Sequence, residues 1–206
     1  MFKNSAEIFA YIKKEDIKLV DVRFTDLPGI QHHFNVPVES FDEAVFTDGL
    51  MFDGSSIRGF QSIHESDMKL LPVPESAYLD PYRKEKTLII IFSVHNPVDN
   101  SAYSRDPRGV VAKAVDFMRA QGIADTAFFA PEAEFYVFDR VRFKTDINTA
   151  YHEIDSYEGA WNTGIKEDAD GTPNRGYRTR IKGGYFPVSP TDQFADLRDE
   201  MVMQLG

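Results

Sequence analysis

Cysteine is absent from this chain of 206 residues, which excludes disulfide bonds and thiolate metal sites. Basic residues are in the minority, 23 against 33 acidic ones, and the net charge of -10 argues against a nucleic-acid partner. No stretch is long enough to span a bilayer, and the start at Met1–Glu7 lacks the long apolar region of a secretory signal. From these absences we expect a cytoplasmic protein with no membrane partner.

The first hundred residues combine the patterns of a helix and of several strands. Asn4 and Glu7 form a capping-box pattern ahead of an apolar set, which predicts a short helix. Apolar residues alternate with polar ones on both sides of the turn Asp26–Gly29, which predicts a β-hairpin. The β-branched run Thr87–Val94 predicts a central strand buried on both faces. Together these features predict the α+β fold class.

Two adjacent histidines, His32 and His33, lie in the second strand of this hairpin. Neighbouring residues of a regular strand point to opposite faces, so the pair cannot jointly chelate one metal ion. We therefore expect structural roles for both.

The turn-rich segment His95–Ser101 predicts a domain border, which we place near residue 103. Beyond it, Asp106 as N-cap, Pro107 at the first helical position and Gly122 after the last turn predict a helix. We expect its apolar stripe to be core, and this stripe consists of Val110, Ala114, Phe117 and Met118.

Later segments carry weaker signals. The polar stretch Asp139–Gly176 has few apolar pairs, and Asp168–Gly171 within it mimics part of a calcium loop. Asp168–Gly171 lacks the further ligands and the terminal glutamate of an EF-hand, so we expect this segment to be a solvated surface loop. Asp192 predicts the start of an amphipathic helix within which the chain stops at Gly206, so we expect a truncated product.

The most informative segment is Pro131–Phe138, which sets Glu132 and Glu134 two residues apart among aromatic side chains. On a strand both carboxylates would point to the same face, about 6 to 7 Å apart. Two like charges in an apolar setting require a proton, an arginine or a divalent metal ion, and oxygen ligands favour magnesium or manganese. The alternative is an edge strand whose glutamates face water.

Two further segments combine glycine with polar side chains. Met51–Phe60 places Asp53, Ser55 and Ser56 on a glycine-hinged loop that could approach a ligand closely. The plainer interpretation is a tight turn in which Asp53 or Ser55 bonds to nearby backbone. Lys182–Val188 contains paired glycines before an aromatic pair, and it is no Walker loop because no Lys-Ser or Lys-Thr follows them.

In their order and spacing, these segments resemble the amino-terminal portion of the bacterial type I glutamine synthetases, in the actinobacterial style. The motifs that carry the resemblance are Phe52–Ile57, Ile63–Met68, Tyr103–Arg108, Pro131–Phe135 and Lys182–Val188. The resemblance implies a β-grasp domain over residues 1–102. Residues 103–206 would then begin a catalytic domain whose curved antiparallel sheet lines a funnel-shaped active site.

The resemblance also implies an activity, the ATP-dependent ligation of ammonia to L-glutamate through γ-glutamyl phosphate, with two or more Mg²⁺ or Mn²⁺ ions per site. Glu132 matches the ligand of the metal that holds the ATP phosphates, and Glu134 the ligand of the metal that contacts glutamate. Asp53, with Ser56 beside it, matches the residue that deprotonates ammonium, and Tyr185 matches a tyrosine lining the same pocket.

In the resembling family Asp53 acts across a subunit boundary, which implies a homo-oligomer of two stacked hexameric rings, with Asp67 near the same interface. Some residues depart from the family pattern without removing a ligand, namely Arg58, Phe60, Ala133 and Ser189. Further ligands of the family lie beyond Gly206, so we expect this chain to be inactive alone.

Two other interpretations stay open. One is a non-catalytic interaction module that kept the ring-facing surface, and the other is a ligase that joins glutamate to a larger amine. Asp53, Ser56 and Tyr185 favour ammonia, because these residues build an ammonium pocket in the resembling family.

Overall fold

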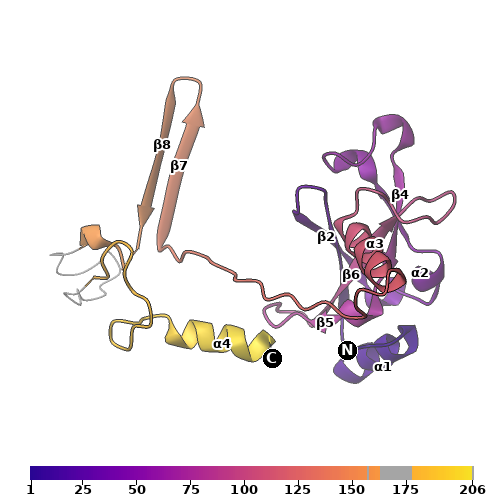
Figure 1. Cartoon of the computed structure of the whole chain (residues 1–206), viewed down its shortest axis with the longest axis horizontal. Helices are drawn as coiled ribbons and strands as arrows, with labels where there is room; N and C mark the ends of the chain where they lie inside the picture. The colour runs from indigo at the N-terminus through magenta and orange to yellow at the C-terminus, as the bar shows by residue number, and fades with distance from the viewer. Residues whose placement is uncertain (157, 163–177, 206) are drawn as a thin grey trace. The chain divides into compact units, whose positions relative to one another are not determined.

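The computed structural model of the chain describes residues 1–156, 158–162 and 178–205. The chain divides into two compact units, Met1–Phe129 and Ala130–Gly206 (Figure 1). The domain border expected near residue 103 stays a prediction. Among the described residues, no helix combines the length and the apolar character that crossing a bilayer requires.

A mixed sheet of six strands forms the centre of the first unit. The strand order is β2-β1-β6-β4-β3, with β5 also paired to β6. β1 and β6 run parallel, and the other pairs are antiparallel. The strands are β1 (Leu19–Thr25), β2 (Gln31–Pro37), β3 (Leu50–Asp53), β4 (Asp67–Pro72), β5 (Tyr78–Leu79) and β6 (Thr87–His95).

Three α-helices and four short 3-10 turns accompany this sheet. They are α1 (Ser5–Glu15), η1 (Val38–Ser40), α2 (Ala44–Thr47), η2 (Gly54–Ser56), η3 (Ile63–Glu65), η4 (Pro74–Ser76) and α3 (Pro107–Ala120). The predicted first helix is confirmed: the Asn4 side chain accepts a hydrogen bond from the backbone N–H of Glu7 at 3.0 Å. The Glu7 carboxylate in turn accepts one from the backbone N–H of Lys3 at 2.8 Å, so the two side chains form reciprocal hydrogen bonds at the start of the helix.

The predicted hairpin and the central strand are confirmed as β1–β2 and β6. β6 contributes fully buried aliphatic and aromatic side chains to the core, among them Leu88, Ile90 and Phe92. Burying each such side chain is worth about 1.5 to 3 kcal/mol, so β6 is a main source of stability in this unit.

The histidine pair has the structural roles that we expected. His32 Nε2 lies 2.8 Å from a carboxylate oxygen of Asp26, and His33 Nδ1 lies 2.7 Å from one of Asp21. Asp21 is fully buried and also accepts a hydrogen bond from Arg23 at 2.9 Å. Each histidine thus serves a separate carboxylate, and they share no site.

The helix that begins after Asp106 is confirmed as α3. The Asp106 side chain accepts from the backbone N–H of Arg108 at 2.9 Å, and Gly122 has a φ of +66° just beyond the last turn. The expectation that its apolar stripe is core is wrong. Val110 and Phe117 are 56% and 63% exposed, and α3 buries none of its side chains, because a stripe becomes core only where a second layer covers it.

The second unit contains the antiparallel hairpin β7 (Arg140–Asp146) and β8 (Thr149–Asp155), the turn η5 (Ala160–Asn162) and the helix α4 (Ala195–Leu205). The hairpin lies in the polar stretch Asp139–Gly176, for which the sequence analysis predicted no strand. The helix after Asp192 is confirmed as α4, and the Asp192 carboxylate accepts the backbone N–H of Phe194 at 3.1 Å. Residues 168–171 lie outside the described part of the chain.

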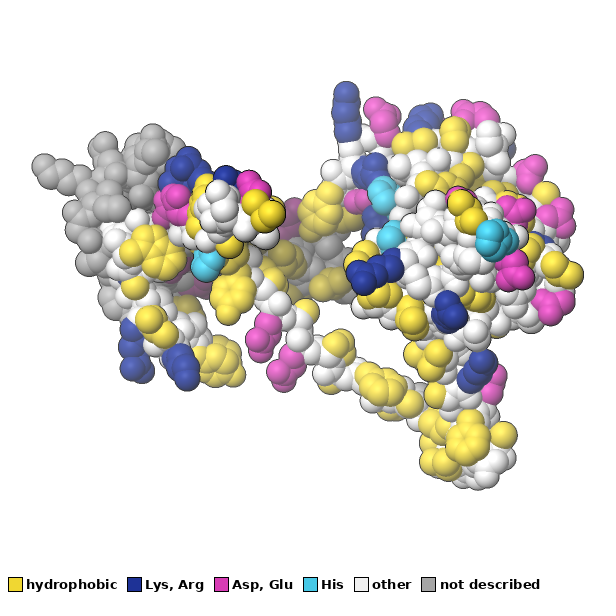
Figure 2. Space-filling model, turned by 90° about the horizontal axis from the view of Figure 1, so that it is seen from above, with side chains coloured by type: hydrophobic (Ala, Val, Ile, Leu, Met, Phe, Trp, Pro, Cys, Tyr) yellow, Lys and Arg dark blue, Asp and Glu magenta, His cyan; other side chains and the backbone are white. Residues whose placement is uncertain are grey.

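The predicted strand over Pro131–Phe138 is not found. Within the described residues, this segment pairs with no neighbouring strand, and backbone pairing to β8 begins only at Asp139, whose N–H donates to Asp155 at 2.9 Å. A strand requires a partner for its backbone groups, and periodicity alone cannot supply one. Figure 2 shows apolar side chains (yellow) uncovered along this thin extended part of the chain.

Candidate functional site

Asp53 ends β3 and caps the 3-10 turn η2, at the start of what we call the Asp53 loop, residues 53–60. Its Oδ1 accepts hydrogen bonds from the backbone N–H of Ser55 at 2.9 Å and from the Ser55 hydroxyl at 2.6 Å. Its Oδ2 accepts one from the Ser56 hydroxyl at 3.2 Å. A carboxylate offers about four lone-pair sites, so Oδ2 retains acceptor capacity for a ligand.

These hydrogen bonds favour the ionised form of Asp53. The Ser55 hydroxyl, followed by the Ser55 backbone N–H, holds the pKa of Asp53 below its usual range. The side chain is exposed and ionised at neutral pH. The turn that we considered as the plainer interpretation therefore does form, and it presents a fixed anion at the surface.

The near end of the loop is fixed by β4. Asp53 lies opposite Asp67 in the β3–β4 register, and the backbone N–H of Gly54 donates to the carbonyl of Ser66 at 2.6 Å. Gly54 is buried, and a Cβ added there would lie 2.5 Å from Met68 Sδ. Glycine is thus required at this position for close approach to a neighbouring strand.

The far end of the loop is fixed by residues that our sequence analysis did not single out for this role. Phe60 is 2% exposed and its ring packs edge-on against Tyr103, with centroids 5.2 Å apart. The Tyr103 hydroxyl donates to the Phe60 carbonyl at 2.5 Å, and Arg105 donates to the same carbonyl and to that of Gly59. The only sequence signal for these contacts was the motif Tyr103–Arg108.

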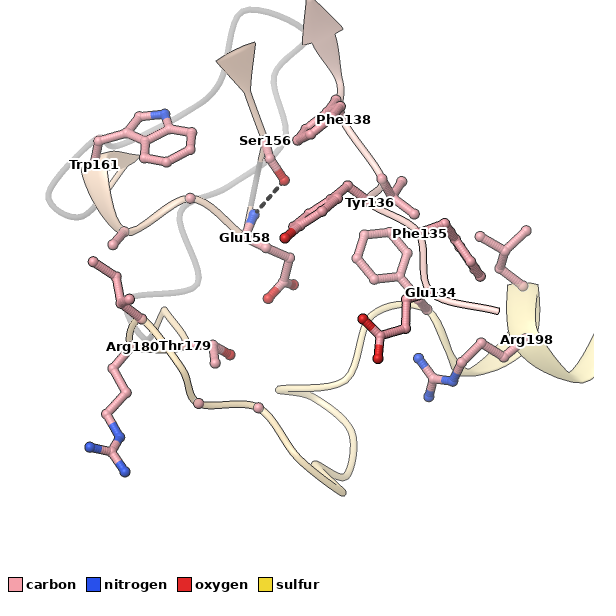
Figure 3. A pocket seen from close by; sticks show the side chains of 18 of the residues that line it. Glu134, Phe135, Tyr136, Phe138, Ser156, Glu158, Trp161, Thr179, Arg180 and Arg198 are labelled. Atoms are coloured by element: carbon pink, nitrogen blue, oxygen red, sulfur yellow. Dashed lines mark hydrogen bonds between the residues drawn. The ribbon is translucent and has the colours of Figure 1, made fainter. Parts of the chain in front are cut away.

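The second unit contains a cavity of about 800 Å³ (Figure 3). Glu134 faces its open space from the extended segment, and Tyr136 and Phe138 stack nearly parallel with centroids 5.8 Å apart. Gly183 and Gly184 of the paired-glycine segment also line it. The cavity therefore brings together parts of two segments that the sequence singled out.

One side of this cavity is stabilised by hydrogen bonds to Asp155. Trp161 Nε1 donates to Asp155 Oδ1 at 3.2 Å, and Asn162 Nδ2 donates to the same oxygen at 3.0 Å. The Asn162 amide, followed by the indole N–H, lowers the pKa of Asp155. On the α4 side, Arg198 lines the cavity and its guanidinium is paired with Asp192.

The other site residues expected in this unit lie outside the cavity. Glu132 is exposed and does not line it, and Tyr185 is 89% exposed, with its ring tilted against Phe186 at 4.4 Å. Within the described ranges neither Glu132 nor Glu134 has an ion-pair partner. Two unpaired hard oxygen donors fit the charge and ligand preference of a magnesium or manganese ion. No cluster of three or more His, Asp or Glu side chains suited to a metal forms among the described residues, so they supply only part of a coordination shell.

Family models match most of the chain. The model of the glutamine synthetase β-grasp domain matches residues 16–97. The model of the glutamine synthetase catalytic domain matches residues 104–206. The expectation of a β-grasp domain followed by the start of a catalytic domain is thus confirmed.

Individual relatives agree with these matches. The chain is 57% identical over 203 residues to a glutamine synthetase of Mycolicibacterium smegmatis, covering 98% of this chain and 42% of that protein. It is 55% identical over 205 residues to one of Frankia alni, covering 100% of this chain and 43% of the relative. A cryo-EM structure of Plasmodium falciparum glutamine synthetase is similar in fold, with a TM-score of 0.83 at 23% identity, over 99% of this chain and 40% of that one. The chain thus spans about two fifths of the length of these relatives.

Proposed function

Because this chain belongs to the glutamine synthetase family, we propose that its protein ligates ammonia to L-glutamate at the expense of ATP. The γ-phosphoryl group of ATP passes to the side-chain carboxylate of glutamate, which gives ADP and γ-glutamyl phosphate. Ammonia then forms the new C–N bond as the C–O bond to phosphate breaks, and inorganic phosphate leaves. The observation that most supports this proposal is the match of both family domains, in order, along one chain.

In this proposal Asp53 receives the ammonium ion and takes its proton. Its serine hydrogen bonds keep the carboxylate ionised, so it attracts the cation, and Oδ2 has room to accept an N–H bond. A positioned carboxylate of this kind acts as a general base. Ser56 orients Asp53, and Tyr185 is assigned to the wall of the same ammonium pocket in the assembled enzyme.

Glu132 and Glu134 are assigned as ligands of Mg²⁺ or Mn²⁺, Glu132 on the side of the ATP phosphates and Glu134 on the side of glutamate. Such an ion would neutralise charge on the transferring phosphoryl group and orient the attacking carboxylate. The exposed carboxylates, which have no ion-pair partner among the described residues, support this assignment. We also propose a cytoplasmic homo-oligomer of two stacked hexameric rings, in which Asp53 serves the active site of a neighbouring subunit.

The test is glutamine formation by the purified full-length protein that contains this chain, with glutamate, ATP, ammonium and magnesium, for the native protein and for Asp53→Asn. We expect kcat/KM for ammonium to fall about 100-fold or more in the variant, the low end of the range for loss of a general base. Raising the pH should restore part of this activity, because free ammonia then replaces ammonium.

The matched control is Asp99→Asn. Asp99 accepts from the backbone N–H of Ser101 at 3.0 Å and from its hydroxyl at 2.7 Å, the same local geometry as at Asp53. This variant should retain native kinetics. A native protein that prefers a larger amine over ammonium in competition, or that forms no glutamine, would contradict the proposal.

A further inference from the structure

Tyr103 and Arg105 belong to a motif that the proposed chemistry does not use, yet they contact the Asp53 loop from 43 to 46 residues along the chain. We propose that these two side chains, which we call the carbonyl clamp, are positioning residues that hold the Asp53 loop in place for ammonium. The inference rests on the proposed function of Asp53, and its test separates the two.

The clamp acts through three hydrogen bonds to two adjacent carbonyls. The Tyr103 hydroxyl donates to the Phe60 carbonyl at 2.5 Å, and Arg105 Nη1 donates to it at 2.9 Å. The same nitrogen donates to the Gly59 carbonyl at 2.5 Å. A guanidinium donor makes a hydrogen bond stronger than that between neutral groups, so the clamp concentrates strong contacts at one point of the loop.

The clamp itself is fixed to the centre of the sheet. The backbone N–H of Tyr103 donates to the Val94 carbonyl of β6 at 2.9 Å. The buried carboxylate of Asp106 accepts the backbone N–H of Val94 at 2.9 Å, and the N–H of Asp106 donates to the Tyr103 carbonyl at 3.1 Å. The segment that carries the clamp therefore moves with the most buried strand of the unit.

Inside the loop, the backbone N–H of Ile57 donates to the Gly54 carbonyl at 3.2 Å, and that of Phe60 donates to the Ile57 carbonyl at 3.1 Å. The near end is tied by the Gly54 N–H to Ser66, and the Ile57 side chain is 9% exposed. Gly59 has a φ of +87° with open space around it, a conformation that lets its carbonyl face Arg105 but adds no packing. Loss of the clamp would leave the far end held by Phe60 packing and by the local hydrogen bond from the Phe60 N–H to Ile57, and the turn that carries Asp53 would move more freely.

Trypsin offers a readout that does not depend on activity, because Arg58 is an exposed cleavage site inside the loop. The test compares the rate of cleavage after Arg58, measured as appearance of the fragment 1–58 by mass spectrometry. Tyr103→Phe removes only the hydroxyl and retains the ring contact with Phe60. Arg105→Met removes the guanidinium. Arg105→Lys retains a positive donor, so its cleavage rate should lie between those of the native protein and of Arg105→Met.

Two controls match these changes elsewhere in the same unit. Tyr82→Phe alters a tyrosine that is 70% exposed, and Arg119→Met removes another arginine that donates to a backbone carbonyl, that of Asp125. We expect cleavage to be about threefold to tenfold faster in Tyr103→Phe, the range for loss of one hydrogen bond, and faster still in Arg105→Met, which loses two bonds from a charged donor. Both controls should match the native rate.

Steady-state kinetics test whether the clamp affects the binding of ammonium. In the assembled protein, the KM for ammonium should rise by at least about threefold in both clamp variants, with the KM values for ATP and glutamate within about twofold of native. Unchanged cleavage would overturn the inference. Faster cleavage with an unchanged KM for ammonium would also overturn it, since the clamp would then be merely structural. A native protein that forms no glutamine would overturn the proposed function instead, while the cleavage rates would still report on the clamp.

Discussion

Replacing Asp106 by alanine should destabilise the first unit by more than the loss of a helix cap. The Asp106 carboxylate is 2% exposed and serves two donors at once. One oxygen caps α3 by accepting the N–H of Arg108, and the other accepts the N–H of Val94, a buried residue of β6. The alanine variant therefore loses the cap and also leaves a buried backbone N–H of the central strand without a partner.

The two losses can be given magnitudes separately. Removal of an N-cap side chain costs about 0.5 to 2 kcal/mol. An unsatisfied buried donor costs about 1 to 3 kcal/mol. We expect Asp106→Ala to lower the free energy of unfolding by about 1.5 to 5 kcal/mol in total. Asp106→Asn should have an intermediate effect, because one amide oxygen can accept from only one side while the amide NH₂ faces the other donor.

Hydrogen exchange of the β6 amides in urea is the suitable assay. Trp161 is the sole tryptophan and belongs to the second unit, so its fluorescence does not report on α3 or β6. Asn4→Ala is the matched control, since Asn4 is an exposed N-cap whose side chain accepts the N–H of Glu7 and serves no buried strand. If Asp106→Ala reduces β6 protection by no more than Asn4→Ala does, the reasoning about the buried Val94 N–H is wrong.

Two further predictions concern the Asp155 side of the cavity and the near end of the Asp53 loop. The folded-state pKa of Asp155 is lowered, so its hydrogen bonds stabilise the fold at neutral pH, and that stability is lost as the pH falls through the folded pKa. Fluorescence of Trp161 should therefore change with a midpoint below about 3.9, the ordinary aspartate value, and Asp155→Asn should abolish the transition. Gly54→Ala should cost about 1 to 3 kcal/mol by overpacking against the fully buried Met68, and a thermal melt of this variant that matched the native one would contradict the close approach.

The elements that the sequence predicted correctly are those whose signals are local. The cap at Asn4, the turn before β2 and the β-branched run of β6 each lie within a few residues of what they control, and each is found. The hairpin β7–β8 was missed because its alternation, with Val141 and Phe143 on one strand, is diluted by charged residues.

The predictions that failed required a second layer or a partner strand. The α3 stripe has helical periodicity, but periodicity does not specify what covers it, and Phe117 is exposed. Glu132 and Glu134 have the spacing of strand residues, but their segment finds no pairing among the described strands. In the same way, the sequence around the Asp53 loop does not indicate its contacts with Tyr103 and Arg105. These residues reach the loop only because the segment after β6 folds back against it.

The hydrogen bonds at Asp53 have opposite effects on the two tasks assigned to it. By lowering the pKa of the carboxylate, Ser55 makes it a more persistent anion and hence a better attractor of ammonium. The same change makes it a weaker base, and ammonium is already a far weaker acid than a carboxylic acid. In the proposed mechanism, proton transfer to Asp53 would therefore be uphill, and the reactive acyl phosphate would have to consume the small amount of ammonia that forms. It follows that the geometry of this turn favours capture of the cation over its deprotonation, so the position of the loop should affect the KM for ammonium before it affects kcat.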